Sequence, residues 1–313
     1  MLLRIACTLS LLGACASTTP TASPGPVSSP PKAEPIASAT PTPSAAPTPS
    51  AAPSPEASTA RSCGALACLE FTSAVAAFQR VLSEHPRVLA IGEAHAQKGS
   101  EGVVSTASRF AEQLLPTLAG QSQHILIELM LGNAKCSQVE KSVSDQQRPI
   151  TENQKATAQN EFVELGNRAK QLGLMPHGLT PSCDEFTALQ QAGDEIVDRT
   201  LTTIARISTR NLETLLTKSL PSSIVVAYGG ALHNDVAPRP GREQWSFAPA
   251  LLEATHGAYL ELDLIVPEFV KDSEVWRAFP WYATYSQVKG SHGALLYTVA
   301  PHSFVRIFPR SSP

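Results

Sequence analysis

The chain has 313 residues, of which 42% are apolar and 16% charged, and its formal net charge is −3. This mildly acidic balance, without any run of Lys or Arg, predicts no nucleic-acid partner. Composition divides the chain, because 39 of the 45 residues from Ala16 to Ala60 are Ala, Pro, Ser or Thr and none is aromatic. Such a segment cannot bury enough apolar surface to offset the entropy of ordering it. We therefore expect a single folded domain over residues 61–313.

Residues 1–14 have the pattern of a secretory signal peptide. Arg4 supplies its positive charge, and the apolar run Ile5–Leu12 is too short to span a bilayer. The run ends in Leu12-Gly13-Ala14-Cys15, which resembles a bacterial lipobox and predicts lipidation of Cys15. Residues 15–60 would then be a disordered tether that holds the domain to a membrane. We expect the protein in the cell envelope at the outer membrane; the alternative is an ordinary signal peptide with an incidental cysteine.

Four cysteines remain once Cys7 leaves with the signal peptide and Cys15 is lipidated: Cys63, Cys68, Cys136 and Cys183. An even number of cysteines in an exported chain indicates disulfides. The first two are five residues apart, which favours a local bond and leaves Cys136 to pair with Cys183. A zinc–cysteine site is the alternative, but the chain has no Cys-x-x-Cys spacing.

Within residues 61–313, apolar periodicity and turn signals predict alternating helices and strands. In chain order they are a helix over 65–83, a strand over 87–93, a helix over 103–115, a strand over 124–130, a polar helical region over 134–172 broken near Arg148–Pro149, a strand over 174–179, a helix over 184–220, and strands over 223–229, 259–266 and 304–308. Strands separated by helices predict an α/β fold with a central, mostly parallel sheet and helices on both faces.

Polar residues stand at three predicted strand ends, where ligands bind in such sheets. The first strand ends in Gly92-Glu93-Ala94-His95, the second carries Glu128, and the fourth runs into a glycine-rich turn before His233. Burial would raise the pKa of Glu128 and destabilise the fold unless the carboxylate is paired or bound to a metal. We expect these four side chains to meet in one cleft, although Glu128 could instead be held by backbone N–H groups or an arginine.

Four segments, in this order, resemble the superfamily of ChaN-like haem-binding proteins, erythromycin esterases and TraB/Tiki proteins: Val88–His95, Ile127–Met130, Phe162–Gly178 and Val225–His233. The resemblance implies an α/β fold and assigns function to Glu93, His95, Glu128 and His233. Members of the superfamily differ in activity, which includes metal-dependent proteolysis, esterase chemistry and haem binding. The sequence departs from the ChaN pattern after His233, and no haem axial ligand of that family matches a position here.

Other polar residues give weaker signals. Glu261 and Asp263 alternate with leucines, which favours the solvated face of an edge strand over a further acid at the cleft. Six further histidines have no partner at ligand spacing and are interpreted as surface or capping residues: His85, His124, His177, His256, His292 and His302. The chain contains no Gly-x-Ser-x-Gly, P-loop, Gly-x-Gly-x-x-Gly or His-Glu-x-x-His motif.

These observations support an exported lipoprotein hydrolase of the protease or esterase class. Either Glu93, His95, Glu128 and His233 hold a divalent Zn, Mn or Fe ion that activates water, or His95 acts as a general base that Glu93 or Glu128 orients. The alternatives are a haem- or iron-binding lipoprotein without turnover and a lipoprotein that keeps these residues for structure. The ligand would be a small molecule, a peptide or haem; the substrate and the oligomeric state do not follow from the sequence.

The predicted anchor gives a direct test. The Cys15→Ser protein should move from the membrane fraction to the soluble fraction, because it lacks the acyl chains that hold the tether to the bilayer. Fractionation followed by mass spectrometry of the N-terminal peptide measures this. Wild-type protein that is soluble and unlipidated would contradict the prediction.

Overall fold

The computed structural model describes residues 60–100, 102–147, 154–155, 157–288 and 293–311. The predicted signal peptide, Cys15 and the tether, up to residue 59, lie outside this part of the chain. None of the helices in the described ranges is long and apolar enough to cross a membrane.

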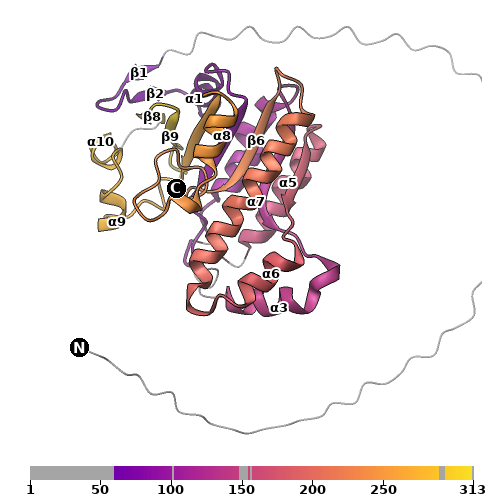
Figure 1. Cartoon of the computed structure of the whole chain (residues 1–313). Coiled ribbons are helices and arrows are strands. Elements are labelled where there is room, and N and C mark those ends of the chain that lie inside the picture. The colour runs from indigo at the N-terminus through magenta and orange to yellow at the C-terminus, as the bar shows by residue number, and fades with distance from the viewer. Residues whose placement is uncertain (1–59, 101, 148–153, 156, 289–292, 312–313) are drawn as a thin grey trace, which may run out of the picture. The chain divides into compact units, whose positions relative to one another are not determined.

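A nine-stranded sheet in the order β1-β2-β8-β9-β7-β3-β6-β4-β5 runs through the domain (Figure 1). Its strands are β1 (Arg61–Ser62), β2 (Leu69–Phe71), β3 (Val88–Glu93), β4 (Ser122–Met130), β5 (Met175–Leu179), β6 (Ile224–Gly230), β7 (Tyr259–Ile265), β8 (Ala294–Ala300) and β9 (Ser303–Ile307). The six strands from β9 to β5 are parallel, and β8, β2 and β1 extend the sheet in antiparallel pairs. The predicted α/β fold with a mostly parallel sheet is confirmed.

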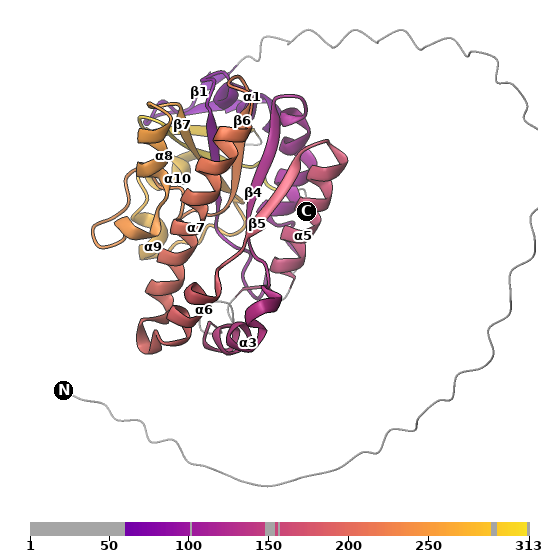
Figure 2. The same ribbon diagram turned by 45° about the vertical axis from the view of Figure 1, so that its right-hand side comes forward.

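Helices cover both faces of this sheet (Figure 2). The α-helices of the described residues are α1 (Ala74–Leu82), α2 (Thr106–Arg109), α3 (Ser137–Gln146), α5 (Ala158–Gln171), α6 (Cys183–Gln190), α7 (Ile196–Lys218), α8 (Ala248–Ala254), α9 (Glu274–Arg277) and α10 (Tyr282–Val288). Successive side chains of β3 point to opposite faces of the sheet. Leu89 and Ile91 pack into the same core as α1 and α5, while Val88 and Ala90 pack against α7 and α8. We call the two sides the α5 face and the α7 face.

Two predicted helices differ from the structure, and three strands, β1, β2 and β8, were not predicted. The helix expected from residue 65 begins at Ala74, because β2 pairs with β8 and Ser73 caps the helix by accepting a hydrogen bond from the Ala76 N–H at 3.1 Å. The helix expected over 184–220 is two helices, α6 and α7, separated at Gly193, whose φ is +54°. Strand β8 was not predicted, and it lies between the early strand β2 and the last strand β9.

The four cysteines in the described part of the chain form one disulfide and one pair of thiols. Cys63 and Cys68 are bonded, as predicted. The predicted Cys136–Cys183 disulfide is not formed; both are thiols in hydrogen-bond contact, and burial together with Cys183 raises the pKa of Cys136. They lie in a small separate core where α3, which follows β4, meets α6, which follows β5. These helices lie together at the bottom of Figure 1.

The contact between the two thiols predicts that they oxidise within the folded protein. Treatment of the native protein with oxidised glutathione should remove both thiols from a denaturing thiol titration and leave the circular dichroism spectrum unchanged. Closing this loop should add about 4 kcal/mol to the free energy of unfolding. The Cys183→Ser protein, as control, keeps one free thiol throughout. Two free thiols that persist in oxidised wild-type protein would contradict the prediction.

Candidate active site

Glu93 is the last residue of β3 and lies on the α5 face, 6% exposed. Its Oε2 accepts a hydrogen bond from the Tyr228 hydroxyl at 2.5 Å, and His95 Nδ1 lies 2.9 Å from Oε1. Burial and, to a lesser extent, the charge of Glu93 raise the pKa of Tyr228, so its hydroxyl stays protonated and can donate this hydrogen bond. Because each carboxylate oxygen has a partner, the cost of burying this acid is offset.

Glu128 comes to the same place from the α7 face, two residues before the end of β4. Its Oε2 accepts a hydrogen bond from the Gly230 N–H at 2.6 Å. A Cβ atom on Gly229 would collide with this carboxylate, and one on Gly230 would lie 3.2 Å from His95 Nε2. The glycine pair at the end of β6 therefore leaves the space in which Glu128 and His95 approach each other.

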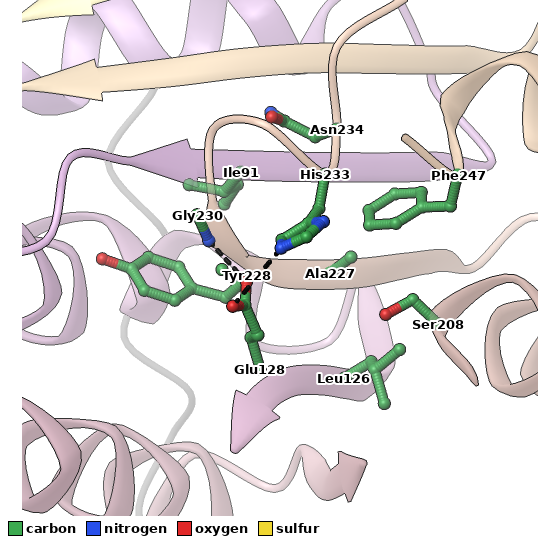
Figure 3. A pocket seen from close by; sticks show the side chains of 11 residues that line it. Ile91, Leu126, Glu128, Ser208, Ala227, Tyr228, Gly230, His233, Asn234 and Phe247 are labelled. Atoms are coloured by element: carbon green, nitrogen blue, oxygen red, sulfur yellow. Dashed lines mark hydrogen bonds and ion pairs between the residues drawn. The ribbon is translucent and has the colours of Figure 1, made fainter. Parts of the chain in front are cut away.

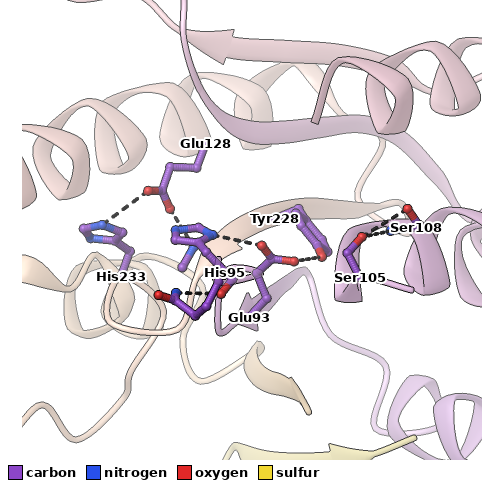
Figure 4. A network of polar contacts seen from close by, with 9 residues as sticks. Glu93, His95, Ser105, Ser108, Glu128, Tyr228 and His233 are labelled. Atoms are coloured by element: carbon purple, nitrogen blue, oxygen red, sulfur yellow. Dashed lines mark hydrogen bonds and ion pairs between the residues drawn. The ribbon is translucent and has the colours of Figure 1, made fainter. Parts of the chain in front are cut away.

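His95 is hydrogen-bonded to Glu93 and lies near enough to Glu128 to feel the charge of that carboxylate (Figure 4). Its Nδ1 faces Glu93, and the edge of its ring packs against Phe162 with centroids 5.8 Å apart. Burial lowers the pKa of His95, but the hydrogen bond and charge of Glu93 and the charge of Glu128 together outweigh burial and raise it to about 9. At neutral pH the ring is an imidazolium, whose Nε2–H lies on the side of Gly230.

His233 lies three residues beyond β6 and is 3% exposed. Its Nδ1 is 2.7 Å from the carbonyl oxygen of Trp245. A carbonyl oxygen only accepts hydrogen bonds, so Nδ1 carries a hydrogen and Nε2 faces Glu128. The distance from Nε2 to Glu128 Oε1 is 3.6 Å, longer than a hydrogen bond, and the two form an ion pair when Nε2 is protonated.

Two acids on β7 hold the loop that carries His233. Asp263 accepts a hydrogen bond at 3.2 Å from the side-chain amide of Asn234, and Glu261 accepts one at 2.9 Å from the Val236 N–H. Burial raises the pKa of both carboxyl groups. The interpretation of Glu261 and Asp263 as a solvated edge-strand face was wrong, because β7 lies inside the sheet between β3 and β9.

A pocket opens beside this cluster on the α7 face (Figure 3). Glu128, Gly230 and His233 line one part of it, and Ser208 and Phe247 line another. It contains about 260 Å³ of empty space, which includes open solvent. The enclosed part of this space is only about large enough for one water molecule, so a substrate group would have to enter from the solvent-exposed side. Glu93 and His95 are not part of its lining.

The structure thus brings the four predicted residues into one linked cluster, but only Glu128 and His233 line the pocket. Within the described ranges, no three His, Cys, Asp or Glu side chains are arranged to hold a metal ion, so the cluster as it stands does not match the predicted metal site. Sequence reasoning missed Tyr228 and Asn234; their positions directly before the glycine pair and directly after His233 were the available signals.

Two of the histidines interpreted as unpartnered do contact each other. His124 on β4 and His177 on β5 lie 3.1 Å apart between Nδ1 and Nε2. Burial is the main cause that lowers the pKa of both rings; the charge of Lys218 and, for His177, the neighbouring His124 ring lower it further. They therefore stabilise the edge of the sheet as neutral rings, and neither is among the residues lining the pocket.

Comparisons with known proteins add little to this description. No protein-family model matches the chain, and a search of curated proteins finds no significant match. Among solved structures, the type III effector HopBA1 is similar with a TM-score of 0.36 and 11% identity, over 72% of this chain and 88% of the effector. A likeness at this level supports no inference about fold or activity.

The contact between Glu93 and His95 predicts a measurable titration. Because the pKa of His95 is raised from 6.5 to about 9, protonation stabilises the fold; this contribution is complete below pH 6.5 and is lost as pH rises through about 9. In the Glu93→Gln protein the pKa should fall below 6.5, because burial then dominates. NMR titration of the His95 ring and thermal unfolding against pH measure both effects.

The matched control is Glu195→Gln, which removes an exposed carboxylate that pairs with Arg199 on a helix surface. This substitution should leave the His95 titration unchanged. A His95 pKa that stays near 9 without Glu93 would show that the carboxylate does not set it.

Proposed function

We propose that the protein is a hydrolase of the ester or peptide-bond class that uses acid–base chemistry at Glu128 and His95. The observation that carries this proposal is the placement of an imidazolium between two carboxylates at the carboxyl edge of a parallel sheet, next to a pocket that one of those carboxylates lines. Environments that separate the proton affinities of neighbouring groups are typical of acid–base active sites.

Each group has one role in the proposed reaction. Glu128 accepts a proton from a water molecule as that water adds to the substrate carbonyl carbon, and the His95 imidazolium donates its Nε2 proton to the leaving group. Glu93 keeps His95 charged and fixes its ring through Nδ1. His233 faces Glu128 Oε1 across 3.6 Å and closes the pocket on that side of the carboxylate.

The proposal assigns no step to a metal ion, because the four side chains do not place three ligand atoms around one point. Metal assistance by Zn, Mn or Fe stays a prediction from the sequence. Elemental analysis of protein purified without a histidine tag tests it independently of turnover.

The proposed place of action follows from the sequence alone. A lipid on Cys15 and a tether of 45 residues would hold the domain at a membrane of the cell envelope, where its substrates would be small molecules or peptides. This placement depends on the fractionation of the Cys15→Ser protein and not on the chemistry of the site.

The test of the proposal is turnover by matched variants. On a panel of nitrophenyl esters and fluorogenic peptides, the Glu128→Gln and His95→Gln proteins should each lose about 100- to 10,000-fold in kcat/KM, the range for a general acid or base. Wild-type kcat/KM should fall as pH rises through about 9, because His95 loses its proton. The Glu253→Gln protein, changed at an exposed helix residue, should keep full activity.

Full activity in the Glu128→Gln protein would refute the assignment. A Soret band on titration with haem, together with no turnover on any member of the panel, would favour the haem-binding alternative instead.

A further inference from the structure

The largest fully buried side chain among the described residues belongs to Arg306 of β9. It is 0% exposed, and none of its three guanidinium nitrogens has a hydrogen-bond partner. Burial, followed by repulsion from Arg109, lowers its pKa to about 9. A buried cation without a hydrogen-bond partner is costly in a protein interior. The cation–π contact of Arg306 with the Phe308 ring offsets part of that cost but satisfies none of the guanidinium N–H groups.

The surroundings of Arg306 carry excess positive charge. The guanidinium carbons of Arg306 and Arg109 lie 3.9 Å and 5.3 Å from the centre of the Phe308 ring. Arg109 is already held by two backbone carbonyls, the Ser311 hydroxyl and, at 3.5 Å, the carboxylate of Glu268. The carboxylate of Glu268 faces Arg109, and its buried Oε2 makes no hydrogen bond, so it does not compensate the charge of Arg306.

A second buried donor without a hydrogen-bond partner lies on α2, the helix that carries Arg109. Thr106, on the same short helix as Arg109 and one turn before it, is 2% exposed, and its hydroxyl makes no hydrogen bond. Buried hydroxyl and guanidinium groups almost always have partners in folded proteins. Unsatisfied donors and an excess positive charge together fit an anion.

Sheet register places Arg306 in line with the candidate active site. Glu93 pairs with Leu264 of β7, and Leu264 pairs with Arg306, so all three lie in one row. Residues in one row of a sheet point to the same face, so Arg306 is on the α5 face, as Glu93 is. Two strand spacings separate Glu93 from Arg306, about 10 Å along the row.

We propose that Arg306, with Arg109 beside it, binds an oxyanion group, either a carboxylate or a phosphate. The planar guanidinium fork matches two oxygens of such a group, which a halide ion cannot offer. An enclosed site strengthens these charge-assisted hydrogen bonds, because the surroundings have a low dielectric constant. The site is independent of the proposed hydrolase activity, since it contains none of the residues assigned to that reaction.

Thermal unfolding of the full chain tests the proposal. Protein dialysed into a zwitterionic buffer is unfolded with increasing inorganic phosphate or acetate, and sodium chloride keeps the ionic strength constant. One or both oxyanions should raise the wild-type midpoint saturably, by about 2–4 °C for each kcal/mol of binding free energy. A response to phosphate alone, to acetate alone or to both identifies the chemical class. No response to either overturns the proposal.

Matched variants locate the response. Arg306→Met keeps the length of the side chain and removes the charge, so its midpoint without anion should exceed that of wild type and should not rise when oxyanion is added. Arg306→Lys keeps the charge but loses the fork, so its response should be weaker. The control, Arg199→Met, removes an exposed guanidinium that is paired with Glu195 and should respond as wild type does.

Two results would overturn the assignment to Arg306. One is an equal oxyanion response in Arg306→Met and wild type. The other is the absence of saturable one-to-one binding when wild-type protein is titrated with phosphate and with acetate in a calorimeter, a measurement that does not depend on the variants folding.

Discussion

Parallel pairing of β3 with β6 fixes where the chemistry of this domain lies. The register sets Glu93 beside Gly230, so the end of one strand, which carries an acid, meets the end of another that has no side chain. Into this space come the carboxylate of Glu128 from the α7 face and the imidazole of His95 from the loop after β3. A side chain on Gly229 or Gly230 would crowd the Glu128 carboxylate, the His95 imidazole or both. The backbone of β6 is therefore as much a part of the site as the acids.

Each buried or half-buried acid at and around the site is compensated by its own hydrogen-bond donor. Glu93 is held by Tyr228 and His95, Glu128 by the backbone of Gly230, and the two β7 acids by Asn234 and the Val236 N–H. Each polar contact positions the next element, since the β7 acids hold the loop on which His233 stands. Arg306 is the exception among the buried charged side chains of the described residues, because it has no hydrogen-bond partner. That contrast makes it a candidate for recognition and not for structure alone.

The segments that follow β4 and β5 add a small core of their own beyond the carboxyl edge of the sheet. Helices α3 and α6 bury Val143, Phe186 and Leu189 together, separately from the cores that contain the strands. The loops that lead into these helices begin where Glu128 and the end of β5 lie, so the small core fixes the surroundings of the site. The Cys136–Cys183 contact joins those two loops through their side chains.

The sequence by itself determined the class of fold and the residues at the strand ends, because both depend on local pattern. Runs such as Val88–Glu93 are long enough in apolar residues to be buried strands, and glycines in the last two residues of β3 and β6 mark where these two strands stop. Only the tertiary structure decided the order of strands, which makes β7 internal, buries Glu261 and half-buries Asp263. It also decided the bonding of Cys136, the partnership of His124 with His177 and the isolation of Arg306, since each depends on contacts between residues far apart in the chain. Local periodicity carries no information about which distant strand becomes a neighbour.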